Sequence, residues 1–359
     1  MLKKAVALFL AGAGLALCVS CAKTTSHFVY AAIPTSSEIL AYREDPNSGA
    51  LTPLAVSPIS AGQGVTSIAI HPSAKFLYAS NSSENNISRF VIASNGVLTE
   101  ITPRMNTTGT TPTVLAMDPA GNYLYVANSE SNNISVFTID INNQGALTAF
   151  GNPTQIGLSP LNMVLSPNGN FVYVTGQSGS QGYVEVFSLS SLATQSQLPL
   201  VQAVLTGTNP FGLAIDPGGK NLYTANFSTA SISEFSIDAS TGALTELSGS
   251  PFGETYTSPV ALLVDSSGKY LYVANQGSAN LAAYSIGSSG GLTLLSGSPF
   301  VSNAQPSVIA TDPDGQYLFV GNQKSSAIES FSLSTGSGTL SEVGSYPVAN
   351  SPTSIVVLK

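Results

Sequence analysis

Residues 114–128 read VLAMDPAGNYLYVAN, a stretch that contains most of one structural unit. Its apolar start, 114–117, predicts a short buried strand. Asp118 to Gly121 predicts a type I turn, because Asp caps its own backbone, Pro presets φ and Gly suits the last position. Residues 123–127 are aromatic, β-branched and apolar, which favours a second strand.

The sequence that follows completes the unit. A polar loop at 128–133 leads to residues 134–139, where apolar and polar side chains alternate as in a half-buried strand. A turn at 140–145 leads to a fourth apolar stretch at 146–150. We therefore predict four antiparallel strands per unit and no helix.

The unit recurs along almost the whole chain. We call the first residue of each predicted turn its anchor. The anchors are separated by 47, 48, 50, 49 and 47 residues and are His71, Asp118, Ser166, Asp216, Asp265 and Asp312. Seven residues after each anchor stands an aromatic: Tyr78, Tyr125, Tyr173, Tyr223, Tyr272 and Phe319. Three residues further on stands Asn81, Asn128, Gly176, Asn226, Asn275 or Asn322. A fixed period of this length indicates one supersecondary unit copied many times, and four-stranded units predict the blades of a β-propeller.

The two ends of the chain supply one more blade. Residues 27–32, 38–43 and 51–56 match the second, third and fourth strands of a unit, and 353–358 match a first strand. With six full copies, this predicts an all-β, seven-bladed propeller closed by the C-terminal strand, and a single domain over 27–359. Closure removes the open sheet edges that invite aggregation.

A second signature, Gly-x-Leu-Thr, introduces the fourth strands. It begins at Gly49, Gly96, Gly145 and Gly242, with variants at Gly290 and Gly338. Glycine permits a positive φ in the preceding hairpin. Residues 189–200 lack the signature, so we expect an atypical outer edge in the fourth blade.

The N-terminus has the pattern of an export signal. Lys3 and Lys4 precede an uncharged, largely apolar run at 5–17 that is too short for a comfortable membrane span. We expect a signal peptide over 1–20, lipidation at Cys21 and a tether over 21–26, with plain secretion as the alternative. This predicts a periplasmic or outer-membrane lipoprotein that contacts the membrane through its lipid only.

The composition of the chain excludes some classes of binding partner. After the signal, nine basic residues face nineteen acidic ones, and this acidic balance without a basic cluster argues against nucleic-acid binding. Both cysteines lie in the N-terminal segment, so no disulfide is expected in the folded domain. We expect a monomer.

Few ionisable side chains are candidates for chemistry. The sequence contains two histidines: His27 opens a strand, and His71 replaces a turn Asp. For His71 a turn role is favoured over that of a base, and Glu38 and Glu254 are the remaining weak catalytic candidates on ring-face loops. No metal cluster, nucleophile triad or cofactor motif is predicted. We interpret the repeated Asn residues as loop residues that tolerate left-handed conformations.

Residues 209–226, NPFGLAIDPGGKNLYTAN, resemble the Y-V-T-N type of propeller repeat, as do 125–128 and 272–275. The mature chain is similar to the seven-bladed lactonase family typified by the propeller type of 6-phosphogluconolactonase. The resemblance implies hydrolysis of a sugar lactone in the central channel, by enzymes that place His and Arg just after the proline preceding the first strand. Here those positions hold no His or Arg: Thr66, Thr113, Leu161, Phe211, Val260, Ser307 and Thr353.

Because this basic group is missing, the sequence favours a binding or scaffolding module of the cell envelope. Its partner would be an unknown envelope protein or a small polar ligand. A lactone (ester) hydrolase of the resembled family is the alternative, and an envelope protein without a small ligand is a third.

Overall fold

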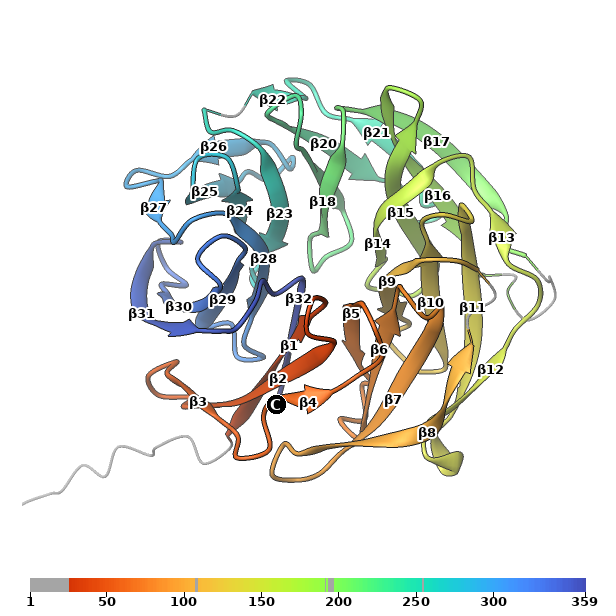
Figure 1. Ribbon diagram of the computed structural model, residues 1–359. Helices are drawn as coiled ribbons and strands as arrows, with labels where there is room; N and C mark the ends of the chain where they lie inside the picture. The colour runs from red at the N-terminus through yellow and green to blue at the C-terminus, as the bar shows by residue number, and fades with distance from the viewer. Residues whose placement is uncertain (1–25, 107–108, 191, 193–196, 254) are drawn as a thin grey trace, which may run out of the picture.

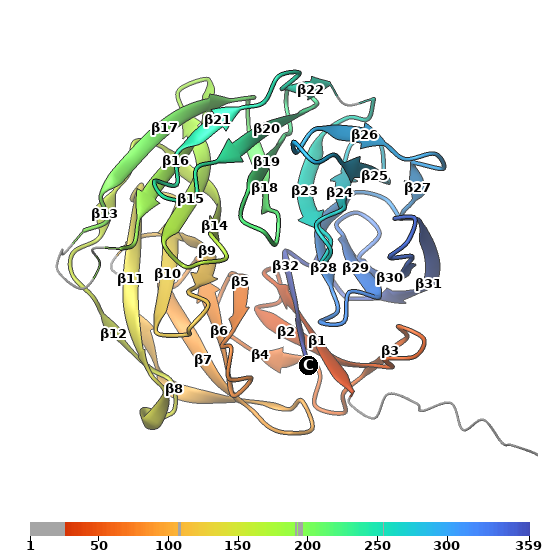
Figure 2. The ribbon, with the colours of Figure 1, turned by 180° about the vertical axis from the view of Figure 1, so that it is seen from behind.

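The structure is a ring of seven β-sheets around a central axis (Figures 1 and 2). It is a computed structural model that describes residues 26–359 except 107–108, 191, 193–196 and 254. The predicted signal peptide, the predicted lipidation site Cys21 and the predicted tether up to residue 25 lie outside the described residues. No helix in the described part of the chain is long and apolar enough to cross a membrane.

Each sheet has four antiparallel positions, as the sequence predicts. The inner strands, nearest the axis, are β5 (Val65–Ile70), β9 (Pro112–Met117), β14 (Ser159–Leu165), β18 (Pro210–Ile215), β23 (Pro259–Val264), β28 (Pro306–Thr311) and β32 (Ser354–Leu358). The second strands are β1 (His27–Ile33), β6 (Phe76–Asn81), β10 (Tyr123–Asn128), β15 (Phe171–Ser178), β19 (Asn221–Asn226), β24 (Tyr270–Asn275) and β29 (Tyr317–Asn322). The third strands are β2 (Glu38–Glu44), β7 (Asn86–Ile92), β11 (Asn133–Asp140), β16 (Gln181–Ser188), β20 (Ser231–Ile237), β25 (Asn280–Ile286) and β30 (Ala327–Leu333).

The outer position differs between blades. Three blades have one long outer strand: β8 (Leu98–Asn106), β17 (Leu200–Thr206) and β31 (Leu340–Pro347). Four have two short ones: β3 (Leu51–Pro53) with β4 (Ile59–Ser60), β12 (Ala146–Ala149) with β13 (Thr154–Gln155), β21 (Leu244–Glu246) with β22 (Phe252–Gly253), and β26 (Leu292–Leu294) with β27 (Phe300–Val301). The 3₁₀ turn η1 (Ile141–Asn143) follows β11. The predicted fourth strands are confirmed, and in four blades the outer position continues into a second short strand that the sequence analysis does not predict.

A serine explains three of the interruptions. Ser57, Ser250 and Ser298 each precede a proline, which cannot donate to a ladder. Their hydroxyls accept the third-strand N–H groups of Ala41, Glu234 and Ala283 at 2.9–3.0 Å. The serine side chain thus replaces the backbone partner where the outer strand breaks.

The closing blade consists of β32, β1, β2, β3 and β4, drawn from both ends of the chain (Figure 1). β1 pairs with β32 from Phe28–Leu358 to Ala32–Ser354. Every residue of β1 is buried. The predicted closure of the ring by the C-terminal strand is confirmed.

The two sequence signatures meet at the borders between blades. A buried tyrosine on the second strand of one blade donates a hydrogen bond to the carbonyl of the signature glycine in the next blade. The bonds are 2.7–3.0 Å long and join Tyr30 to Gly96, Tyr78 to Gly145, Tyr173 to Gly242, Tyr223 to Gly290 and Tyr272 to Gly338. These glycines have positive φ, as the sequence predicts. Burial raises the pKa of these tyrosines, so their hydroxyls remain donors.

The repeated Asn residues are not loop residues in left-handed turns, so that interpretation is wrong. Asn81 and Asn128, like their counterparts, end the second strands and are fully buried. Asn81 Nδ2 donates to Asn86 Oδ1 at 2.7 Å and to Ser88 Oγ at 3.0 Å. Such bonds tie the start of the third strand to the second. The left-handed residues stand elsewhere in the hairpins, for example at Asn85.

Candidate functional site

A cavity of about 410 Å³ occupies the axis of the ring and is lined by all seven inner strands. The lining includes all seven positions that follow the prolines or their equivalent: Thr66, Thr113, Leu161, Phe211, Val260, Ser307 and Thr353. These seven positions therefore face the central channel. No acidic, basic or histidine side chain is among the described residues that line it.

The hydroxyl groups of the lining join neighbouring inner strands, which form no ladder with one another. Thr66 Oγ1 donates to Pro112 O at 3.0 Å and also lies 3.1 Å from Ser80 Oγ. Ser307 Oγ shares its hydrogen between Gly321 O at 3.0 Å and Pro352 O at 3.1 Å. Thr353 Oγ1 donates to Thr66 O at 2.9 Å. Because a hydroxyl has one hydrogen and two lone pairs, these groups present acceptors to the cavity.

Other lining groups are available as donors. Ser354 Oγ accepts the Ile68 N–H at 3.2 Å, which leaves its own O–H group able to donate. Ser67 Oγ likewise accepts the Leu115 N–H at 3.1 Å. Asn162 Nδ2 uses one of its two hydrogens on Phe211 O at 2.8 Å. The cavity therefore offers acceptors and donors of neutral character, beside the apolar side chains of Leu161, Val260 and Phe211.

His71 lies away from this cavity, in the anchor turn that follows β5. It is buried, its Nε2 donates to Gly121 O at 2.9 Å, and its Nδ1 accepts the Ser73 N–H at 3.0 Å. Both ring nitrogens are thus used in joining two adjacent turns. This geometry is that of the turn role favoured from the sequence.

Glu38, the other catalytic candidate that the structure describes, does not line the cavity. Glu38 begins β2 and is half-buried opposite Ser60. Glu254 lies outside the described residues. Among the described residues one group could hold a metal ion, His27 with Glu44 and Asp312, and it also lies outside the cavity.

Three buried glutamates lie on third strands, away from the axis. Glu329 accepts a hydrogen bond from Asn322 Nδ2 at 2.8 Å. Burial raises the pKa of Glu185, and the hydrogen bond from the Gly157 N–H opposes this shift. Burial raises the pKa of Glu234 to about 7, and the Leu292 N–H opposes this shift. These carboxyl groups hold blade borders and loops in place and do not line the cavity. None of them can therefore act as a general base there.

Glu234 gives a pH-dependent prediction. The unfolded chain ionises this carboxyl near 4.5 and the folded chain near 7, so stability falls as pH rises between these values and is constant above them. Glu234→Gln keeps an acceptor for Leu292 but removes the charge. We expect it to stabilise the protein by about 1–3 kcal/mol at pH 8 and to have no such effect below pH 4.5.

Urea unfolding of the parent and Glu234→Gln at both pH values is the measurement. The exposed Glu130→Gln is the matched control, for which we expect no pH-dependent difference. A Glu234→Gln protein that is no more stable than the parent at pH 8 contradicts the assignment of a buried charge.

Comparison with known proteins identifies the family. The family described as "Lactonase, 7-bladed beta-propeller" matches residues 22–160, 141–251 and 248–357. The chain belongs to this family. No curated protein shows significant sequence similarity to this chain.

Solved structures of similar fold span nearly the whole chain. A putative 6-phosphogluconolactonase from Bacteroides fragilis has a TM-score of 0.80 at 19% identity, covering 94% of this chain and 99% of its own. The periplasmic gluconolactonase of Pseudomonas aeruginosa has a TM-score of 0.76 at 21% identity, covering 93% and 99%. At such identities the likeness shows the fold alone. Family membership nevertheless favours the lactone hydrolase over the scaffolding module that the sequence led us to prefer.

Proposed function

We propose that this lactonase-family protein binds an uncharged, hydroxyl-bearing lactone in its central cavity and hydrolyses it. The family supports the reaction type. The observation that carries the substrate class is the neutral lining of the cavity, whose polar groups are hydroxyls and one amide.

The lining suits sugar-like hydroxyls better than phosphate. A phosphate carries charge and needs donors and cations in its site. Thr66, Ser307 and Thr353 have already given their hydrogens to carbonyls, so they accept from a ligand. A ligand rich in O–H groups supplies the matching donors. The export predicted from the N-terminal segment fits this choice, since phosphorylated sugars are cytosolic.

The reaction needs little from the protein. Water adds to the ring carbonyl carbon, the ring C–O bond breaks, and the hydroxy acid is formed. Donors aimed at the carbonyl oxygen stabilise the charge that develops there, and Ser354, Ser67 and Asn162 are the donors that the cavity offers. Because no base lines the described cavity, the acceleration would come from positioning and hydrogen bonding.

The test compares two lactones that differ in one phosphate. We expect the purified protein to open glucono-1,5-lactone with saturable kinetics above the spontaneous rate. For 6-phosphogluconolactone we expect no acceleration. Saturable opening of the phosphorylated lactone would overturn the substrate class, and absence of saturable opening of either would leave a binding module.

A further inference from the structure

The anchor turns form a ring of contacts on one face of the propeller, and this ring has one gap. A Cβ added to the glycine of one turn would lie 2.5–3.5 Å from the turn of the preceding blade, as for Gly121 beside His71 and Gly268 beside Pro217. The closing blade has no such turn, because its first two strands, β32 and β1, are not consecutive in the chain. There the ends of these two strands meet the Asp312–Gly315 turn. Lys359 Nζ donates to Asp314 Oδ1 at 2.9 Å.

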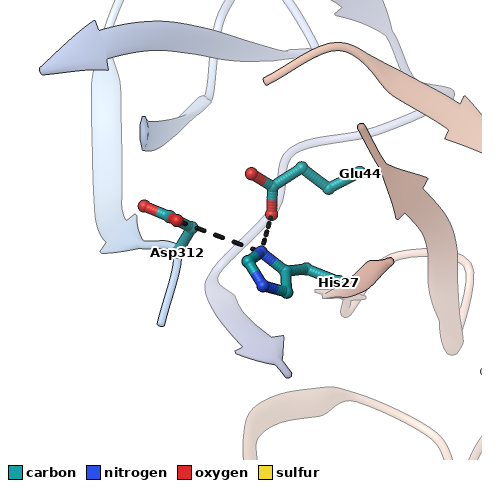
Figure 3. A group of neighbouring side chains, drawn as sticks. All are labelled: His27, Glu44 and Asp312. Atoms are coloured by element: carbon teal, nitrogen blue, oxygen red, sulfur yellow. Dashed lines mark hydrogen bonds and ion pairs between the residues drawn. The ribbon is translucent and has the colours of Figure 1, made fainter. Parts of the chain in front are cut away.

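A buried ligand set lies in this gap (Figure 3). His27 Nδ1 is 3.2 Å from Glu44 Oε2 and 3.9 Å from Asp312 Oδ2, and the three atoms lie within 4.8 Å of one another. The three side chains are at most 1% exposed. They come from β1, from the end of β2 and from the turn between β28 and β29. They therefore join the closing blade to the preceding blade, and we call this border the seam.

The charges of this group favour a cation. Glu44, Asp312 and Asp314 place three carboxylates around one imidazole, and Lys359, which pairs with Asp314 among the described residues, is 61% exposed. Burying ionised carboxylates is costly unless they are paired or coordinate a metal.

Asp312 also differs from its counterpart in the preceding blade. Asp265 Oδ2 accepts two donors from one residue of its own turn, the N–H and the hydroxyl of Ser267. Asp312 Oδ1 accepts the Gln316 and Tyr317 N–H groups, while Oδ2 accepts Asp314 N at 3.2 Å and faces His27. The seam thus has a carboxylate oxygen directed at an imidazole, which the Asp265 turn lacks.

We propose that His27 Nδ1, Glu44 Oε2 and Asp312 Oδ2 bind one divalent first-row transition ion, represented by Zn²⁺. An imidazole nitrogen with two carboxylates suits Zn²⁺, whereas Ca²⁺ and Mg²⁺ prefer oxygen ligands. His27 Nδ1 lies 3.2 and 3.9 Å from the two carboxylate oxygens and all three atoms lie within 4.8 Å of one another, so small shifts would bring each atom to a bond of about 2.0–2.2 Å with one ion. Asp314 Oδ2, 3.8 Å from His27 Nε2, stands where a carboxylate orients a metal-binding imidazole. The bound ion ties the first strand to the blade across the seam.

The experiment is a Zn²⁺ titration of the full chain after dialysis against a chelator. All proteins carry Cys18→Ser and Cys21→Ser, because these thiols could bind Zn²⁺ themselves. We expect one Zn²⁺ per chain and a rise in the melting temperature on loading. His27→Gln should abolish both effects, and Asp312→Asn should weaken binding at least tenfold.

Asp265→Asn is the matched control, because it makes the same change at the same turn position without a neighbouring histidine. We expect it to bind Zn²⁺ as the parent does. Equal binding by the parent and His27→Gln, or none by the parent, overturns the proposal. If His27→Gln does not fold, X-ray absorption of the Zn²⁺-loaded parent decides: imidazole nitrogen with carboxylate oxygen is expected, and an oxygen-only shell refutes the site.

Discussion

Deletion of residues 353–359 is expected to open the ring and to lower the melting temperature sharply. The deletion removes β32, its five-residue pairing with β1, and the buried side chains of Ile355 and Leu358. Those two side chains alone contribute about 3–6 kcal/mol, against a typical total stability of about 5–15 kcal/mol. The deletion also exposes the edge of β1, all of whose residues are buried in the intact ring.

Thermal unfolding of the truncated and intact proteins measures this effect. Removal of Lys359 alone is the control, because it is mostly exposed and its ion pair with Asp314 contributes little. A protein lacking 353–359 that melts with the intact one would refute closure of the ring by the C-terminal strand.

Much of the fold is predictable from this sequence because the period repeats. The anchor turns, the second-strand aromatics and the glycine signature are each visible along the chain. The hydrogen bond from Tyr78 to Gly145 cannot be seen in the sequence, because the two residues are 67 positions apart and belong to different blades. The broken outer strands are also missed, since Ser250 replaces a backbone partner through its side chain.

The candidate site is predictable only in part. The periodic position after each proline identifies Val260 and its equivalents as channel residues, and their uncharged character is visible in the sequence. The bonds that turn Thr353 and Ser307 into acceptors depend on neighbouring blades. The group of His27, Glu44 and Asp312 joins residues from opposite ends of the chain, and no local spacing indicates it.

Filling the central cavity is expected to abolish lactone hydrolysis while leaving the ring folded. Val260 is a partly exposed residue of β23 that lines the cavity. Val260→Trp places an indole in space that the proposed substrate needs. Because misplacement of a substrate by about 1 Å can cost about a hundredfold in rate, we expect a fall in kcat/KM of at least that size.

The most direct test measures kcat/KM for glucono-1,5-lactone in the parent, Val260→Trp and Val301→Trp. Val301 is 85% exposed on the outer strand β27, so the same substitution there leaves the cavity untouched. If the cavity is the active site, Val260→Trp loses the activity and Val301→Trp retains it, with both melting near the parent. A folded Val260→Trp protein that opens the lactone as fast as Val301→Trp would contradict the central cavity as the site of hydrolysis.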